Sequence, residues 1–240
     1  MSPATKIFRP AWTAVALCVF TLSGVAVWAG EGEEEGDLDI IKRVDDVPVM
    51  PTKIVKDDYE SVEGLRNRVP VKVPGYLVKE VYYADRAPVY TTACEKRDQG
   101  NYVTAVKGFR KALEMMADPQ KWKWAPEYCN FGMGNALFDG NYFEGYTDKE
   151  GHKYQTPSYY FREVIKTNPK SRFLFEAHVK LAISLAEEGK LDEAQKAFDE
   201  AQAAIKAFKD KMMKVDAKYK HIADKYATMA VMGNARMLEK

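Results

Sequence analysis

The hydrophobic pattern changes from strand-like to helix-like about one third of the way along the chain. Residues 52–84 contain short runs rich in Val, Ile and Tyr that Pro70, Pro74 and Gly75 interrupt, a pattern typical of short β-strands. From residue 87 onward, apolar residues recur at helical spacing. The pattern predicts a mostly α-helical protein with a small β module of about three strands. Because so few strands are marginally stable alone, we expect the module to pack against the first helix.

A glycine-centred turn occurs three times in the helical part, at Gly100, Gly140 and Gly189. Each turn follows a helix-like run, and the first and third lead directly into another run. Repeated helix-turn-helix units cannot bury their apolar faces singly, so they stack against one another. The repeats therefore predict an array of helical hairpins.

Two of these hairpins resemble the tetratricopeptide repeat. The spacings Ala105-x3-Phe109 and Ala194-x3-Phe198 match the small and aromatic positions of that family. The second unit departs from the pattern, because an insertion at residues 143–156 follows its turn. The resemblance covers residues 86–206 and implies a helical-hairpin solenoid whose first helices line a concave groove for a protein or peptide partner.

The resemblance also implies which side chains line that groove. The inward-facing family positions include five side chains suited to binding an extended peptide: Tyr90, Arg97, Glu127, Asn130 and Phe138. Family members that clamp a terminal carboxylate have Lys and Asn where this chain has Tyr90 and Cys94, which departs from that ligand class. With only three units, the alternative is that the β segment or the insertion covers these groups.

The chain after the third turn has a heptad pattern. Apolar residues alternate in steps of three and four, and no Gly or Pro occurs between Gly189 and Gly233. The C-terminal segment, residues 207–240, either folds back as a capping helix with a break near residues 210–216 or projects and pairs with a second copy of the chain. In the second case, a homodimer would form through one set of seam residues: Phe208, Met212, Val215, Tyr219, Ile222 and Tyr226.

Residues 1–29 have the layout of an export signal. Lys6 and Arg9 precede a nearly uncharged run over residues 11–29 that ends on a small residue. The segment is either cleaved or retained as a membrane anchor, since the run is about long enough to cross a bilayer. Both alternatives predict an exported protein of the periplasm or cell envelope, with residues 30–51 as an acidic linker.

Composition excludes several functional classes. The 240 residues carry a net charge of +1 without a basic stripe, which argues against a nucleic-acid partner. The three histidines have no metal-ligand spacing, and no phosphate-binding or nucleophile motif occurs. We therefore predict no metal, cofactor or catalytic site. Cys94 and Cys129 either pair in an oxidising compartment or remain buried free thiols.

Together these features predict a non-catalytic scaffold or adaptor that binds a protein partner in the cell envelope. The alternative is a self-assembling structural subunit that dimerises through the C-terminal heptad helix.

Overall fold

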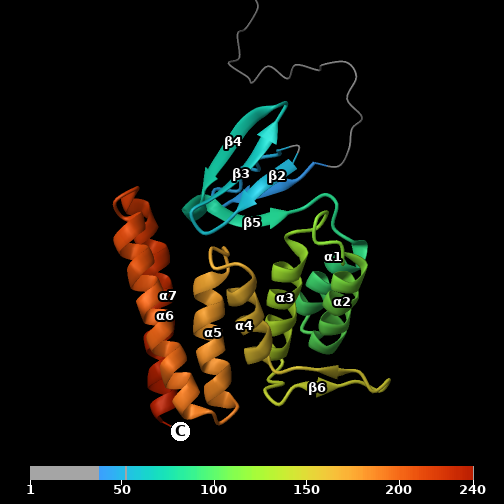
Figure 1. Ribbon diagram of the computed structural model, residues 1–240, viewed down its shortest axis with the longest axis vertical. Coiled ribbons are helices and arrows are strands. Elements are labelled where there is room, and N and C mark those ends of the chain that lie inside the picture. Colours follow the sequence, from blue (N-terminus) through green and yellow to red (C-terminus); the bar gives the residue numbers. More distant parts are fainter. Residues whose placement is uncertain (1–37, 52, 240) are drawn as a thin grey trace, which may run out of the picture. The chain divides into compact units, whose positions relative to one another are not determined.

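The computed structural model describes residues 38–51 and 53–239, and this part of the chain is mostly α-helical (Figure 1). Its seven α-helices are α1 (Pro88–Asp98), α2 (Tyr102–Met115), α3 (Ala125–Asp139), α4 (Pro157–Thr167), α5 (Leu174–Glu187), α6 (Leu191–Met212) and α7 (Lys220–Leu238). The predicted mostly α class is confirmed. The export signal predicted for residues 1–29 and the acidic start of the linker lie outside the described residues.

Five short strands precede the helices in the described chain. They are β1 (Ile40–Arg43), β2 (Lys53–Asp57), β3 (Ser61–Arg66), β4 (Val69–Pro74) and β5 (Val78–Tyr82). β2, β3 and β4 form one antiparallel sheet, and β1 pairs with β5 in a second. Asn67 and Arg68 both have positive φ, so β3 and β4 are joined by a two-residue turn of the type that suits strand twist.

The prediction that residues 30–51 form a linker is wrong for β1. Ile41 is fully buried and faces Val81 of β5. Four residues carry too little alternation to predict a strand, and their partner lies 40 residues later in the sequence. The inner faces of both sheets share one apolar cluster, which Tyr128 of α3 joins and against which Tyr90 of α1 packs.

The helices form three antiparallel hairpins, α1/α2, α3/α4 and α5/α6, and each helix packs on the next along the chain. Gly100 and Gly189 have φ of 74° and 75°, the left-handed conformation in which glycine ends a helix without strain. In the second turn Asn141 adopts this conformation, with φ of 59°, while Gly140 does not. The glycine repeat therefore predicts the turn but not its left-handed residue, because asparagine also tolerates this region.

Aromatic residues fill the space between the hairpins. Phe109, Phe161 and Phe198 are each fully buried. A Cβ added at Gly132 would lie 2.7 Å from the Phe109 ring, and one at Gly134 would lie 2.9 Å from the Phe161 ring. The two glycines thus let α3 approach the aromatic side chains of α2 and α4.

The insertion forms a small hairpin of β6 (Tyr146–Thr147) and β7 (Lys153–Tyr154) between α3 and α4. Tyr154 is buried in the cluster that joins α1, α2 and α3. In Figure 1 this hairpin lies at the opposite end of the helices from strands β1–β5, so it does not cover the surface that faces β5.

The C-terminal segment folds back, with a break after Met212 that agrees with the predicted position. Asp216 caps a short 3-10 helix by accepting a hydrogen bond from the backbone N–H of Lys218. α7 then packs against both α6 and α5, so the heptad seam is satisfied within one chain. None of the described helices combines the length and the hydrophobicity needed to cross a bilayer.

The residues predicted for self-association are mostly internal. Phe208, Met212 and Tyr219 are buried, and the remaining partly buried pair joins the same apolar cluster: Ile222 and Tyr226. Val215 lies in the turn before α7 with 71% of its surface exposed. A dimer made through this seam would therefore require α7 to detach from α5 and α6 of the same chain.

Candidate functional site

A groove of about 590 Å³ lies between β5 and the first helices of the three hairpins. We call it the β5 groove. Its helical wall contains Tyr90, Cys94 and Arg97 of α1, Tyr128, Phe131 and Asn135 of α3, and Glu176 and Lys180 of α5. The α3 residues recur at steps of three and four, so they share one helix face. All five residues from Lys79 to Tyr83 line the opposite wall.

The floor of the groove is aromatic. Trp124 stacks on Tyr83 with ring centroids 4.5 Å apart and an interplanar angle of 3°. Phe131 stacks on Phe173 at 4.1 Å and 16°, and the Tyr90 ring meets Trp124 edge-on at 5.5 Å. These contacts fix the rings from several sides, so the floor is a rigid apolar platform with polar tips.

The charged side chains of the groove differ in how they are paired. Lys180 Nζ lies 2.8 Å from Glu176 Oε1 and donates to Asn135 Oδ1 at 2.6 Å. Arg97 pairs with the adjacent Asp98 at 2.9 Å. Each of these cations is therefore neutralised by a neighbouring carboxylate.

Arg172, two residues before α5, also lines the groove. Its Nη2 donates to the backbone carbonyl of Lys79 at 3.2 Å. Burial lowers the pKa of the guanidinium, but Tyr128 and Asp57 nearby raise it more, so the net shift in its pKa is upward and the group stays cationic. Among the described residues it forms no ion pair within 4 Å.

Asp57 of β2 joins the strand module to α3 behind the groove. Its Oδ2 accepts hydrogen bonds from the hydroxyls of Tyr83, at 3.0 Å, and Tyr128. Burial and the nearby carboxylate raise the pKa of both phenols, so they remain protonated donors. This arrangement links β2 and the residue that follows β5 to α3.

Glu127 faces the other side of α3, in a second pocket of about 550 Å³ beside β2. The side chain is 6% exposed. Its two oxygens accept hydrogen bonds from Ser171 Oγ at 2.6 Å and Asn168 Nδ2 at 2.7 Å. Burial raises the pKa of Glu127 to about 7, with a smaller contribution from the Asp57 carboxylate.

The structure separates the five predicted groove residues. Tyr90 and Arg97 line the β5 groove, and Glu127 lines the second pocket. Asn130 and Phe138 line neither of the two pockets. Phe138 instead packs on the buried core between hairpins two and three, with its ring 6.2 Å from that of Phe161.

The difference comes from the rotation of α3 about its axis. Tyr128, Phe131 and Asn135 face the groove, each one position or more away from the residues that the family register selects. The i, i+3 aromatic pair Tyr128 and Phe131 is the sequence signal that could have located this face. The contribution of β5 and Arg172 has no local signal, since it arises from contacts 93 residues apart.

No family model matches the chain, and a search of curated proteins gave no match. The function is therefore inferred from the geometry of the β5 groove.

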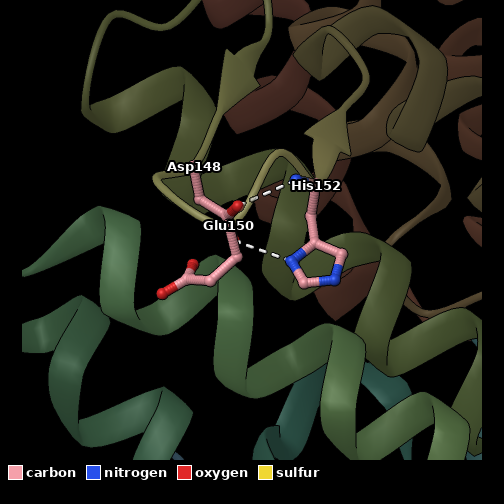
Figure 2. Close-up of side chains that lie close together, drawn as sticks. All are labelled: Asp148, Glu150 and His152. Carbon is pink, nitrogen blue, oxygen red and sulfur yellow. Dashed lines mark hydrogen bonds and ion pairs between the residues drawn. The ribbon is translucent and has the colours of Figure 1, made fainter.

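A second group of chemically capable side chains lies at the tip of the β6–β7 hairpin (Figure 2). Ligand atoms of Asp148, Glu150 and His152 lie within 4.8 Å of one another, a set that could hold a metal ion. However, Lys107 Nζ lies 3.1 Å from Asp148 Oδ2 and 2.6 Å from Glu150 Oε2. The ammonium group supplies the positive charge, and the cluster fastens the hairpin to α2.

Hydrogen bonds keep Asp148 ionised. Burial raises the pKa of its carboxyl, but the backbone N–H of His152, the Lys107 ammonium and the His152 ring lower it more, so the pKa lies well below its ordinary value. His152 Nδ1 lies 3.2 Å from Asp148 Oδ2 (Figure 2).

Cys94 and Cys129 are both free thiols. Cys129 is fully buried, and burial raises the pKa of its thiol. The two alternatives were a disulfide and two free thiols, and the structure shows free thiols. A raised pKa keeps the group protonated and unreactive.

Proposed function

We propose that this chain is a non-catalytic binding protein that holds an extended segment of a partner protein in the β5 groove, and acts as a scaffold or adaptor. One observation supports the proposal most directly. The first helices of three successive hairpins and one strand together line a groove whose floor is made of stacked aromatic rings. In this proposal the hairpins form a solenoid like that of tetratricopeptide repeats, with Tyr90 and Arg97 on its concave wall.

The size and chemistry of the groove support a peptide ligand. Its volume of about 590 Å³ lies within the range of roughly 300–1,000 Å³ found for ligand clefts. Rigid aromatic rings supply large contact area at low entropic cost and are enriched among residues that dominate binding energy. The mixed charges of its rim suit a polypeptide rather than a polyanion such as nucleic acid.

The proposed location is the periplasm or cell envelope. The cationic start and apolar run of residues 1–29 support export, followed by cleavage or by retention as an anchor. A partner in the same compartment is then expected.

Site-specific photocrosslinking tests the proposal. A benzoylphenylalanine placed at Glu95, exposed on α1 in the groove wall, should form defined adducts with a partner protein in intact cells. The same cross-linker at Tyr159, 46% exposed on α4 and outside the groove, should give none. Equal adducts at both positions, or adducts at Tyr159 alone, would contradict binding in the groove.

A further inference from the structure

β1 pairs with one edge of β5. The hydrogen bonds of β1 show which β5 residues bond to it and which point to the other edge. Ile41 of β1 exchanges both backbone hydrogen bonds with Val49, at 2.8 and 2.9 Å, so its N–H and C=O point away from β5. Backbone groups alternate in direction along a strand. The neighbours of Ile41 therefore bond to their register partners on β5, Tyr82 and Glu80, and Val81 between these two points its own N–H and C=O to the opposite edge.

That opposite edge faces the β5 groove. Alternate side chains of a strand lie on opposite faces, yet five consecutive residues from Lys79 to Tyr83 line the groove. Only an edge presents consecutive residues in this way. Figure 1 shows β5 lying across the ends of α3 and α5.

A contact already made by the protein confirms the direction of this edge. The carbonyl of Lys79, two residues from Val81, accepts a hydrogen bond from Arg172 Nη2 across the groove. Val81 has no such partner within the described residues. Its N–H and C=O thus form an unused donor and acceptor pair in the wall of an aromatic groove.

The charges of the groove select the sign of a ligand side chain. Arg172 and Arg86 have no ion pair within 4 Å in the described chain. Arg86 donates from Nε to Thr91 Oγ1 and stacks over the Tyr82 ring. The acidic groups of the lining are either paired, as Glu176 is, or exposed at the rim: Glu80, Glu95, Asp98 and Asp139. Asp57, behind the groove, acts on Arg172 electrostatically but forms no ion pair with it within 4 Å in the described chain, so the guanidinium has no carboxylate in contact.

We propose that the partner segment binds as an added strand on β5, pairing its backbone with Val81 and placing an Asp or Glu side chain against Arg172. This inference rests on the proposed function and names the conformation and charge of the ligand. Strand addition takes its affinity from main-chain hydrogen bonds and its specificity from alternate side chains. Here the side chain next to the acidic one would lie on the floor made by Trp124 and Phe131.

The surrounding helices explain why this edge is suited to one peptide and not to aggregation. Exposed strand edges pair indiscriminately unless they are covered or interrupted. β5 is interrupted at Lys79, where the register with β1 shifts, and the helical wall limits access to the groove. Four extended residues span about 13 Å, so a short segment is enough to reach from Val81 to Arg172 and the aromatic floor.

The test begins with a displayed library of random seven-residue peptides selected on the full chain. We expect enriched sequences to contain Asp or Glu beside an aromatic or branched residue. Replacing that acid by its amide in a synthetic peptide should weaken binding at least tenfold, as should Arg172→Gln, and the two changes together should cost no more than either alone. Arg162→Gln, on the exposed surface of α4, is the control and should change nothing.

Amide hydrogen exchange of the labelled chain then tests the added strand. With the peptide at a hundred times its Kd, exchange at the Val81 amide should slow by up to about a hundredfold. The amides of Tyr82 and Glu80, which already bond to β1, are internal controls and should change little. N-methylation of one peptide residue should abolish both binding and the Val81 protection.

The outcomes separate this inference from the proposed function. If no peptide is enriched, both fail. If peptides bind but Val81 exchange is unchanged, the groove function stands and strand addition is overturned. Enriched peptides without acidic residues would overturn the role of Arg172.

Discussion

Replacing Glu127 by glutamine should make the stability of this protein less dependent on pH. Glu127 is buried beside β2, where Ser171 and Asn168 donate to its two carboxylate oxygens. Both donors favour the charged form, but burial outweighs them and raises the pKa of Glu127 from 4.5 to about 7. The folded protein therefore binds a proton here that the unfolded chain has already released at neutral pH.

The sign and size of the effect follow from linkage. Below pH 4.5 the carboxyl is protonated in both states and contributes no pH dependence. Between pH 4.5 and about 7 the folded state holds more protons, so the free energy of unfolding falls as pH rises. Each pH unit between the two pKa values is worth about 1.4 kcal/mol, which gives a total loss of about 3 kcal/mol by pH 8. Glutamine is neutral throughout, although it exchanges one accepted hydrogen bond for a donor.

The measurement is urea unfolding of wild type and Glu127→Gln, followed by the helical circular dichroism signal at half-unit steps from pH 4.5 to pH 8.5. Other groups titrate in both proteins, so the quantity of interest is the difference in unfolding free energy. That difference should move by about 3 kcal/mol in favour of the variant as pH rises. Glu95→Gln is the control, because Glu95 is exposed on α1 and a solvated carboxylate contributes little to stability.

A flat difference curve would refute this reasoning. It would mean that Glu127 is ionised in the folded protein across the whole range, and that Ser171 and Asn168 compensate for its burial. A carboxyl whose pKa is lowered on folding would give the same flat curve, since its effect on stability lies below pH 4.5.

Two further predictions concern the packing of the hairpins. Gly132→Ala should lower the free energy of unfolding by about 1–3 kcal/mol, measured by urea unfolding, because the new methyl group would lie 2.7 Å from the Phe109 ring; Phe109→Leu in the same chain should recover part of the loss. Phe208→Asp should cost about 3–5 kcal/mol, since its ring packs 4.6 Å from that of Phe175. Val215→Asp, on the same predicted seam but exposed, should change stability by less than about 0.5 kcal/mol; a dimer in sedimentation that Val215→Asp dissociates would contradict the intrachain role of the seam.

The helical part of the fold could be predicted because its signals are local. Glycine turns at Gly100 and Gly189 and the steps of three and four along α6 and α7 each depend on a few neighbouring residues. The same pattern left open whether the seam is satisfied by a second chain or by the same chain. That choice depends on the turn after Met212, where Asp216 caps the new helix.

The candidate site could be predicted only on the α1 side. Tyr90 and Arg97 lie where the family register puts them, because α1 starts the array and its exposed face has no earlier helix to repack it. On α3 the register fails. Glu127 is drawn toward Ser171 and Asn168, 44 and 41 residues later in the sequence, and these contacts have no local signature. The strand that closes the groove was predicted, but nothing in its sequence indicates which helices it faces.

The segment between α6 and α7 also has a role that neither a cap nor a dimer seam predicts. The hydroxyl of Tyr219 accepts a hydrogen bond from the backbone N–H of Gly75 at 3.2 Å and donates one to the carbonyl of Glu60. Tyr76 donates to Asp216 at 2.9 Å. The strand module is thus tied to the C-terminal end of the array as well as to α3.

Attachment at two separated places bears on how the β5 groove can bind. At one end Asp57 accepts from Tyr83 and Tyr128, and at the other Tyr219 holds the segment that leads into β5. The strand wall is therefore in place before any ligand arrives, and association does not have to order it. Since ordering loops and side chains is a major cost of binding, the remaining entropic cost falls on the partner segment. A rigid wall of this kind favours a ligand that is recognised through its backbone, because main-chain groups keep the same geometry in every sequence that can extend along β5.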